Sequence, residues 1–251
     1  MPSSIVVEHN GHRMTFDEEK HSYIDDNGKS YLSVTRLVGM GFEKFDAVSI
    51  AKKKALKDGT DWRKLVQEWE ENGRRAAFFG TRLHQNCEMQ ILGNEESLNE
   101  PTSPQEKINF DLAYGLVKKM KEDRSIIKLE PEKLVFSPKL GIAGSIDLLA
   151  YRANGDYTIF DWKNIKSLDT TGFNGKCGIL DATKDLQDSN YWHYALQLQT
   201  YELLLKVEEY IPKKASVSRV LNCFIDGRVV KAELPDIMEN VKSLIKWAVR
   251  R

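Results

Sequence analysis

Two apolar runs joined by a short turn, residues 142–151 and 157–163, constrain the fold of this chain more than any other feature. Short apolar runs that are rich in β-branched and aromatic residues and separated by a glycine-bearing turn predict two antiparallel strands. Each run carries charge, because Asp147 interrupts the first, and Asp161 and Lys163 lie at the end of the second. Side chains two residues apart on a strand share one face, so Asp161 and Lys163 point the same way.

The position of Asp147 depends on the turn between these strands. If residues 154–155 form a two-residue turn, Asp147 lies opposite Trp162, on the other face from Asp161. If residues 153–155 form a three-residue loop whose terminal glycine is left-handed, Asp147 lies opposite Asp161. A site shared by the two carboxylates requires the second register, or a bulge.

Two neighbouring carboxylates repel each other unless a cation lies between them. A hard divalent ion such as Mg²⁺ or Mn²⁺ suits carboxylate oxygens, and it can polarise a phosphodiester and lower the pKa of a bound water. An adjacent lysine can hold or deprotonate the attacking water, or stabilise the pentavalent state. From Asp161 and Lys163 alone, a plain ion pair at a sheet edge is the commoner explanation.

Further polar side chains lie on predicted elements elsewhere in the chain. They are His84 with Glu88 one helical turn along, Glu130 and Glu132 on the strand before the hairpin, and His193, Gln197 and Tyr201 on one face of a later helix. Taken alone, each set fits a surface position or the polar side of an amphipathic helix.

The rest of the sequence alternates strand and helix signals. Strands are expected at 13–16, 21–24, 29–32, 127–137, 218–225 and 228–234, and helices from 34, at 46–57, 61–73, 76–92, 104–123 and 190–210, and after Pro235. The polar residues 164–189 are expected to form a lid, an arch or a disordered loop. We therefore expect one α/β domain over residues 1–251, with helices packed around a mixed central sheet.

Three helix signals are specific enough to compare with a structure. They are an N-cap at Ser33, a capping box over residues 103–106, and a core-facing stripe of Leu196, Leu203, Leu204 and Val207.

Composition excludes several classes of protein. Cys87, Cys177 and Cys223 form no C-x-x-C pair, so neither a zinc ribbon nor an iron–sulfur cluster is expected. The 37 basic and 37 acidic residues balance, although basic clusters such as Arg74-Arg75 could together form a rim that accepts a polyanion. No apolar run approaches the roughly 20 residues that span a bilayer. Residues 1–4 are unlike the start of a signal peptide. We expect a cytoplasmic protein without a membrane partner, in the host cytoplasm if it is phage-encoded.

A resemblance to the PD-(D/E)XK nucleases of the RecB type is carried by an ordered set of residues: His84, Glu132, Gly-Ser-Ile-Asp147, Asp161-Trp-Lys163 and Gln197-x-x-x-Tyr201. That branch includes the CRISPR adaptation exonucleases, the mitochondrial genome maintenance exonuclease and many phage exonucleases. The opening "HSYIDDNGKSYLSVTRLV" is also similar to phage members. The resemblance implies a restriction-endonuclease-like core, with a central mixed sheet flanked by helices. Residues 1–103 would supply an N-terminal hairpin and helices carrying His84, and residues 104–251 the catalytic core.

The same resemblance implies a metal site for Mg²⁺ or Mn²⁺. Asp147 and Asp161 would be the principal ligands, joined by the backbone carbonyl of Trp162. His84 would complete the shell from its helix.

The resemblance also implies roles in catalysis and substrate binding. Lys163 would be the catalytic lysine, acting with Asp147 and Asp161, and Gln197 and Tyr201 would contact the scissile phosphate or the adjacent nucleotide.

Glu132 would be the upstream acid of the family, with Glu130 on the same strand face as the alternative.

The activity implied is a metal-dependent DNA exonuclease that acts on single-stranded or processed ends. A structure-specific or restriction-like endonuclease uses the same chemistry and stays open as an alternative. A second alternative, from another class, is an inactive nucleic-acid-binding module. The chain has no G-x-x-x-x-G-K-[ST] motif, so any unwinding would come from a helicase or recombination partner.

Overall fold

The computed structural model describes residues 4–250, so Met1 to Ser3 and Arg251 lie outside the description that follows. The strands are β1 (Ser4–His9), β2 (His12–Asp17), β3 (Ser22–Asp25), β4 (Ser30–Ser33), β5 (Ile126–Ser137), β6 (Ile142–Arg152), β7 (Tyr157–Asn164), β8 (Val217–Ile225) and β9 (Arg228–Ala232). The helices are α1 (Val34–Gly39), α2 (Ala47–Asp58), α3 (Trp62–Leu92), α4 (Pro104–Glu122), α5 (Asn190–Val207) and α6 (Met238–Val249), with 3-10 turns at Glu95–Ser97 and Phe173–Gly175.

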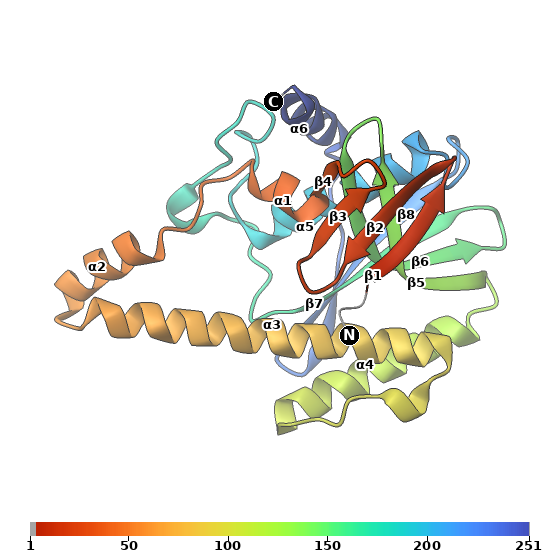
Figure 1. Ribbon diagram of the computed structural model, residues 1–251. Coiled ribbons are helices and arrows are strands. Elements are labelled where there is room, and N and C mark those ends of the chain that lie inside the picture. The colour runs from red at the N-terminus through yellow and green to blue at the C-terminus, as the bar shows by residue number, and fades with distance from the viewer. Residues whose placement is uncertain (1–3, 251) are drawn as a thin grey trace.

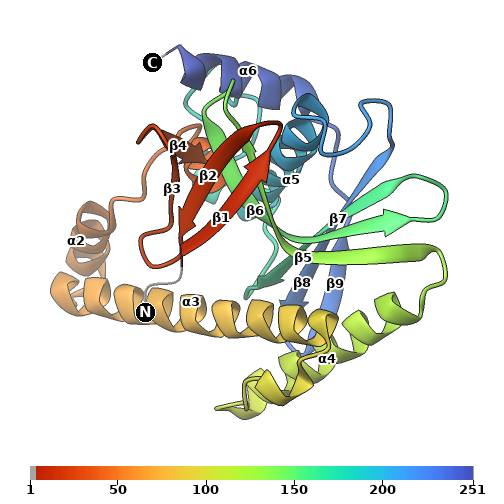
Figure 2. The ribbon, with the colours of Figure 1, turned by 45° about the vertical axis from the view of Figure 1, so that its right-hand side comes forward.

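One mixed sheet contains all of these strands, and helices cover both of its faces (Figures 1 and 2). Helix α4, strands β5, β6 and β7, helix α5 and strand β8 follow one another along the chain. Strand β6 is antiparallel to both β5 and β7, whereas β8 runs parallel to β7. This is a restriction-endonuclease-like core, and the expected fold class is confirmed.

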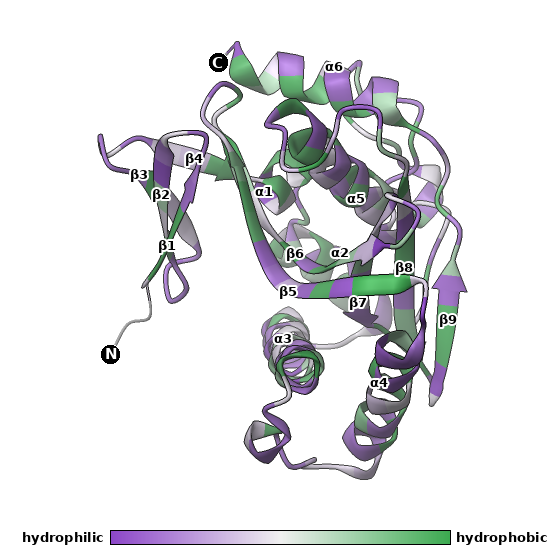
Figure 3. Ribbon diagram, turned by 90° about the vertical axis from the view of Figure 1, so that its right-hand side faces the viewer, coloured by the Kyte–Doolittle hydropathy of each residue, from purple (hydrophilic) through white to green (hydrophobic). Residues whose placement is uncertain are grey.

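The N-terminal strands form a meander that joins the core through one short contact. Strand β4 runs parallel to β6 and pairs with it at Leu32↔Ile142 and Ser33↔Ala143. Strand β7 pairs with β6 further along, from Leu148 onward. Figure 3 shows β1 to β4 set apart from the core strands. Residues 144–147 of β6 therefore lie in a fork between β4 and β7.

The register of the β6–β7 hairpin settles the question that the sequence left open. Leu148 pairs with Phe160, so the next positions along the two strands bring Asp147 opposite Asp161. Gly155 has a φ of +84° and its N–H bonds to the carbonyl of Arg152 at 3.0 Å, which closes a three-residue loop. The register that places both carboxylates on one face is confirmed.

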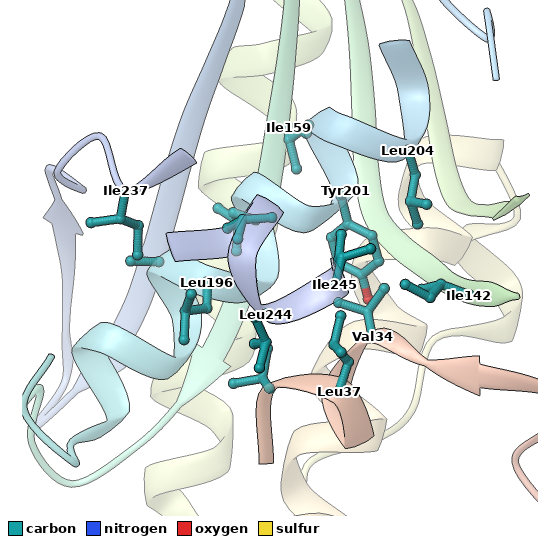
Figure 4. Close-up of a cluster of buried hydrophobic side chains, with 14 of the residues drawn as sticks. Val34, Leu37, Ile142, Ile159, Leu196, Tyr201, Leu204, Ile237, Leu244 and Ile245 are labelled. Atoms are coloured by element: carbon teal, nitrogen blue, oxygen red, sulfur yellow. The ribbon is translucent and has the colours of Figure 1, made fainter. Parts of the chain in front are cut away.

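Two apolar clusters hold the helices against the sheet. On one face, α1, α5 and α6 share one cluster with β6, and Figure 4 shows Leu37, Tyr201 and Leu244 of these helices in that cluster with Ile142. On the other face, α3 and α4 pack on a cluster that contains Phe160 and Trp162 of β7. Strand β7, which carries Asp161 and Lys163, is therefore held by apolar packing on both of its faces.

Several expected boundaries are confirmed, including the strands from β2 to β9. The Oγ atom of Ser33 accepts from the N–H of Arg36 at 3.2 Å as an N-cap. The Oγ atom of Ser103 caps α4 in the same way, but the Glu106 carboxylate accepts from Thr102 rather than closing the reciprocal bond of a capping box. Strand β1 is an additional element that was not predicted from the sequence.

The break expected between residues 73 and 76 is wrong, because α3 is one 31-residue helix. A single interior glycine costs only about 1 kcal/mol relative to alanine, and a long helix propagates through it. The start expected at Pro235 is also displaced, since α6 begins at Met238. The N–H of Ile237 bonds to Oε1 of Gln199 at 2.8 Å and holds the chain outside the helix until that point.

The leucine stripe on α5 is only half right. Leu196 and Leu204 are fully buried, but Leu203 is half-buried and Val207 is exposed. Leu198 and Leu205 are buried in place of the last two. Because α5 packs against the sheet and also against α1 and α6, its apolar surface is wider than one stripe.

Residues 164–189 form a packed loop rather than a disordered one. The Thr183 hydroxyl donates to the carbonyl of Gly41 at 2.7 Å, and Ala182 and Leu186 belong to the main apolar cluster. Within residues 4–250, none of the helices combines the length and the apolar content that crossing a membrane requires.

Candidate metal and catalytic site

The first carboxylate of the site, that of Asp147, lies on β6 in the fork between β4 and β7. At the end of the paired region, one carboxylate oxygen of Asp147 accepts from the backbone N–H of Trp162 at 2.8 Å. A side chain thus takes the place of a strand carbonyl at the point where β6 and β7 separate. Asp147 is held rigidly, facing the fork.

Helix α3 adds the imidazole of His84 from across the fork. Nε2 of His84 donates to the carbonyl of Trp162 at 2.8 Å, since a carbonyl oxygen can only accept. Nδ1 then lies 3.6 Å from a carboxylate oxygen of Asp147 and 4.0 Å from one of Glu132. The imidazole therefore faces two carboxylates and a carbonyl at once.

Strand β5 contributes Glu132, at the position across from Asp147. Its backbone has a φ of +44°, a region that non-glycine residues enter at a cost and that is enriched at functional sites. One carboxylate oxygen accepts from the Ser145 hydroxyl at 2.8 Å. Burial, and then the charge of Asp147, raise the pKa of Glu132 to about 7, while His84 opposes the shift.

Strand β7 contributes the second carboxylate and the amine. Asp161 is 2% exposed, and its Oδ2 lies 2.6 Å from Nζ of Lys163. Burial raises the pKa of Asp161 to about 6 against the opposing charge of Lys163. The carboxylates of Asp161 and Asp147 outweigh burial and hold the pKa of Lys163 above its usual value, so Lys163 is an ammonium at neutral pH.

Helix α5 closes the site from the remaining side. Nε2 of Gln197 donates to Oδ1 of Asp161 at 3.3 Å. Tyr201 is 4% exposed and packs so closely on Gly144 that a methyl group there would come within 2.7 Å of its ring. A cavity of about 320 Å³ lined by both side chains also reaches His84 and Asp147.

The residues fit a divalent cation. One ligand atom from each of His84, Glu132 and Asp147 lies within 4.8 Å of the others, and an imidazole nitrogen with carboxylate oxygens is a donor set that divalent metals accept. Asp161 lies outside this three-residue group and is paired with Lys163. Its buried Oδ2 is held by that ion pair, and its Oδ1 accepts from Gln197.

The structure thus brings together all eight residues predicted for the site: His84, Glu132, Asp147, Asp161, Trp162, Lys163, Gln197 and Tyr201.

It separates two further candidates from them, since Glu130 bonds to Tyr151 and Lys133 instead and His193 pairs with Asp188. Glu88 lies closer, in a cavity that His84 and Glu132 also line.

Two residues beside the site were missed by sequence reasoning. The ring of Tyr194 lies 5.3 Å from Nζ of Lys163, and the Ser145 hydroxyl orients Glu132. Tyr194 precedes Gln197 by three residues on one helix, and Ser145 precedes Asp147 by two on one strand. These spacings put each on the face of a predicted site residue, which is the signal that could have found them.

The similarities of this chain are to solved structures. No protein-family model and no curated protein matches the chain. Among solved structures, a candidate exonuclease from Eubacterium rectale is 12% identical, with a TM-score of 0.38 over 70% of this chain and 65% of that one. The protein SSO0001 is 17% identical, with a TM-score of 0.29 over 68% of this chain and 73% of that one. The chain spans just under two thirds of the first structure, and neither likeness says what the chain does.

Proposed function

We propose that this protein is a divalent-metal-dependent nuclease that hydrolyses phosphodiester bonds in DNA. The observation that carries the proposal is the convergence of His84, Glu132 and Asp147 beside the buried pair of Asp161 and Lys163. A cation held there would neutralise charge on the phosphate and activate a water. Without a cation, the carboxylates of Glu132 and Asp147 would repel each other in a buried site, which is unfavourable for a protein that has no use for them.

Each side chain has a distinct task in this proposal. His84 and Asp147 hold the cation with the carbonyl of Trp162, and Asp161 joins them. The Lys163 ammonium, aimed into the site by Asp161, stabilises negative charge that develops on the phosphate.

Glu132 occupies the upstream acidic position, kept in place by Ser145. Gln197 and Tyr201 line the cavity where the phosphate or the adjacent nucleotide would lie. We assign these residues, and the residues 4–250 that surround them, to one nuclease domain.

Among nucleases, we favour an exonuclease that acts on single-stranded or processed ends over an endonuclease. The ordered set of motif residues supports this choice, since it resembles the RecB-type branch. His21 and Tyr23 of the N-terminal meander line the cavity of the site, and a site enclosed on that side suits a chain end better than a continuous duplex.

The experiment uses end-labelled linear single-stranded DNA, linear duplex and circular single-stranded DNA, each with Mn²⁺ or Mg²⁺ and with EDTA. An exonuclease degrades the linear substrates and leaves circles intact, whereas an endonuclease also cuts circles. Lys163→Ala should abolish cleavage and keep DNA binding. A wild-type protein that binds DNA and cleaves none of the three would support the inactive binding module instead.

Metal binding is measured separately by calorimetry with Mn²⁺. His84→Ala should weaken the affinity at least about tenfold, because it removes one member of the three-residue group. His12→Ala, at an exposed position of strand β2, is the matched control. Equal affinities in the two variants would remove His84 from the metal site.

A further inference from the structure

A second cavity, of about 600 Å³, lies beyond the end of β7, between the middle of α3 and the start of α4. Its wall begins at Asn164, the residue that directly follows Lys163 on the strand. Arg75 and Phe79 reach it from α3, and Lys166 from the loop after β7. None of the eight site residues lines it. Its volume lies in the range of pockets that hold small ligands.

Three side-chain amides in this wall, those of Gln105, Asn109 and Asn164, are joined by hydrogen bonds, and we call this chain of amides the relay. Nε2 of Gln105 donates to Oδ1 of Asn109 at 3.3 Å, and Nδ2 of Asn109 donates to Oδ1 of Asn164 at 3.1 Å. Asn109 is 5% exposed, so the middle of the relay is fixed, while its two ends line the cavity. An amide offers a donor and an acceptor side by side, which is the pattern that the edges of nucleobases require.

The charge of the cavity suits a phosphate. Arg75 and Lys166 form no ion pair within residues 4–250, although both line the wall. Asp226 is the one carboxylate among the residues that line this cavity, so the balance of formal charge is positive. Cationic side chains that line a cavity without an ionic partner attract an anionic ligand, because its negative charge neutralises theirs.

The cavity on the other side of the metal site has the opposite character. It measures about 540 Å³ and is lined by Glu18, Glu88 and Glu132. Consecutive stretches of α3 line the two cavities, and His84 lies next to the acidic one. A polyanion that approaches the site is therefore attracted on the β7 side and repelled on the other.

We propose that the cavity beyond β7 is a nucleotide subsite, which holds a nucleotide of the strand whose phosphodiester lies at the metal site. The proposal rests on the nuclease function proposed above and adds where the substrate strand is gripped. Arg75 and Lys166 bind its phosphate, Phe79 offers a ring for stacking, and the relay ends Gln105 and Asn164 meet the base edge.

The spacing along α3 agrees with this arrangement. Phe79 precedes His84 by five residues and Arg75 precedes it by nine, which at the helical rise corresponds to about 7.5 Å and about 13.5 Å. These are distances over which neighbouring nucleotides of one strand follow each other. At about 100° per residue, Phe79 and Arg75 leave α3 on another face than His84, so a strand that reaches both the metal site and the cavity passes the end of β7, where Asn164 follows Lys163.

The test measures binding without metal, so that it does not depend on catalysis. A fluorescein-labelled deoxythymidine 10-mer is titrated with the full chain in EDTA, and its anisotropy gives the Kd. The variant Arg75→Gln/Lys166→Gln should weaken binding at least tenfold. It should also reduce the slope of log K against log salt concentration by about one to two, since two phosphate contacts are lost.

The matched control is Arg74→Gln/Lys64→Gln, which removes the same charge from exposed positions of α3 outside the cavity. It should change the Kd less than threefold. An equal loss in both double variants would overturn the subsite, because it would show only the general electrostatics of the surface.

A third variant tests the relay. Gln105→Ala, at an exposed position, should change the ratio of the Kd values for deoxyadenosine and deoxythymidine 10-mers severalfold. An unchanged ratio would overturn the assignment of the relay to base contact.

The outcomes distinguish the two proposals. If the wild type cleaves DNA and the cavity variant binds as tightly as the control, the subsite is wrong and the nuclease function stands. If the wild type neither binds nor cleaves DNA, both proposals fail.

Discussion

At the scale of single residues, the site depends on two close contacts between a side chain and the backbone. Asp147 accepts the N–H of Trp162 where a strand carbonyl would otherwise lie, and Tyr201 fills the space that Gly144 leaves open. The sequence contains the charged pair and its spacing, which is why Asp147, Asp161 and Lys163 could be predicted. It does not contain the close approach of α5 to β6, because that depends on tertiary packing between residues far apart in the chain.

Gly144→Ala tests this close approach. The new methyl group would lie 2.7 Å from the Tyr201 ring and 3.2 Å from a methyl group of Val34, both of which are buried. Overpacking of this kind should lower the free energy of unfolding by about 1–3 kcal/mol, measured by urea denaturation. Gly115→Ala in α4 is the control, since its methyl group meets no atom within 4 Å. A destabilisation no larger than that of the control would contradict the packing described.

Glu130 gives a prediction about pH. Burial alone would raise its pKa, but hydrogen bonds from Tyr151 and Lys133 lower it to about 2. A carboxylate with a lowered pKa stabilises the fold above its unfolded pKa and loses that contribution as pH falls toward the folded value. Between pH 4.5 and about 2, the wild type should therefore lose stability more steeply than Glu130→Gln.

Urea midpoints measured across this pH range would show the difference. Glu122→Gln is the control, because its pair with Lys118 is exposed. Parallel pH profiles for the wild type and Glu130→Gln would remove the proposed contribution.

At the scale of elements, local signals predicted the strands well and the helix limits less well. The turn at Asn154-Gly155 left two registers open, and the structure has the three-residue loop. Gly73 suggested a helix break that does not exist, because a local propensity of about 1 kcal/mol is small beside the packing of a long helix. Strand β1 was missed although a local signal for it exists, because Asn10-Gly11, with both residues at positive φ, is the two-residue turn that joins it to β2.

Gly73→Ala distinguishes one helix from two. In a continuous α3, the exposed Gly73 meets no neighbour, so alanine should raise the free energy of unfolding by about 0.5–1 kcal/mol. Gly59→Ala should do the opposite, because Gly59 ends α2 with a φ of +67°. Destabilisation by both substitutions would indicate a break at Gly73.

At the scale of the whole molecule, the N-terminal meander and the core share one apolar cluster. Met14 and Phe16 of β2 pack with Leu134 and Phe136 of β5, although only two backbone pairs connect β4 to β6. Side-chain packing, rather than the sheet ladder, should therefore make the meander unfold together with the core. The sequence predicted one domain from the absence of a linker, and cooperative unfolding is the direct test.

Phe16→Ala provides that test. The side chain is 7% exposed, so its loss should cost about 3–5 kcal/mol. All five tryptophans follow residue 60, outside the meander, and report on the rest of the chain. Tryptophan fluorescence and far-ultraviolet circular dichroism should therefore shift to the same lower urea midpoint. A fluorescence transition that keeps the wild-type midpoint would show that the meander unfolds separately.

The bond from Trp162 to Asp147 has a consequence for how sequences with this fold diverge. A copy that lost its chemistry would still need an acceptor at position 147, because the buried N–H of Trp162 would otherwise have no partner. Aspartate or asparagine at that position is thus expected in active and silent copies alike. The Lys163 ammonium donates to the carbonyl of Trp162, but that carbonyl also has the bond from His84, so substitution at position 163 is the earlier sign that selection for cleavage has ended.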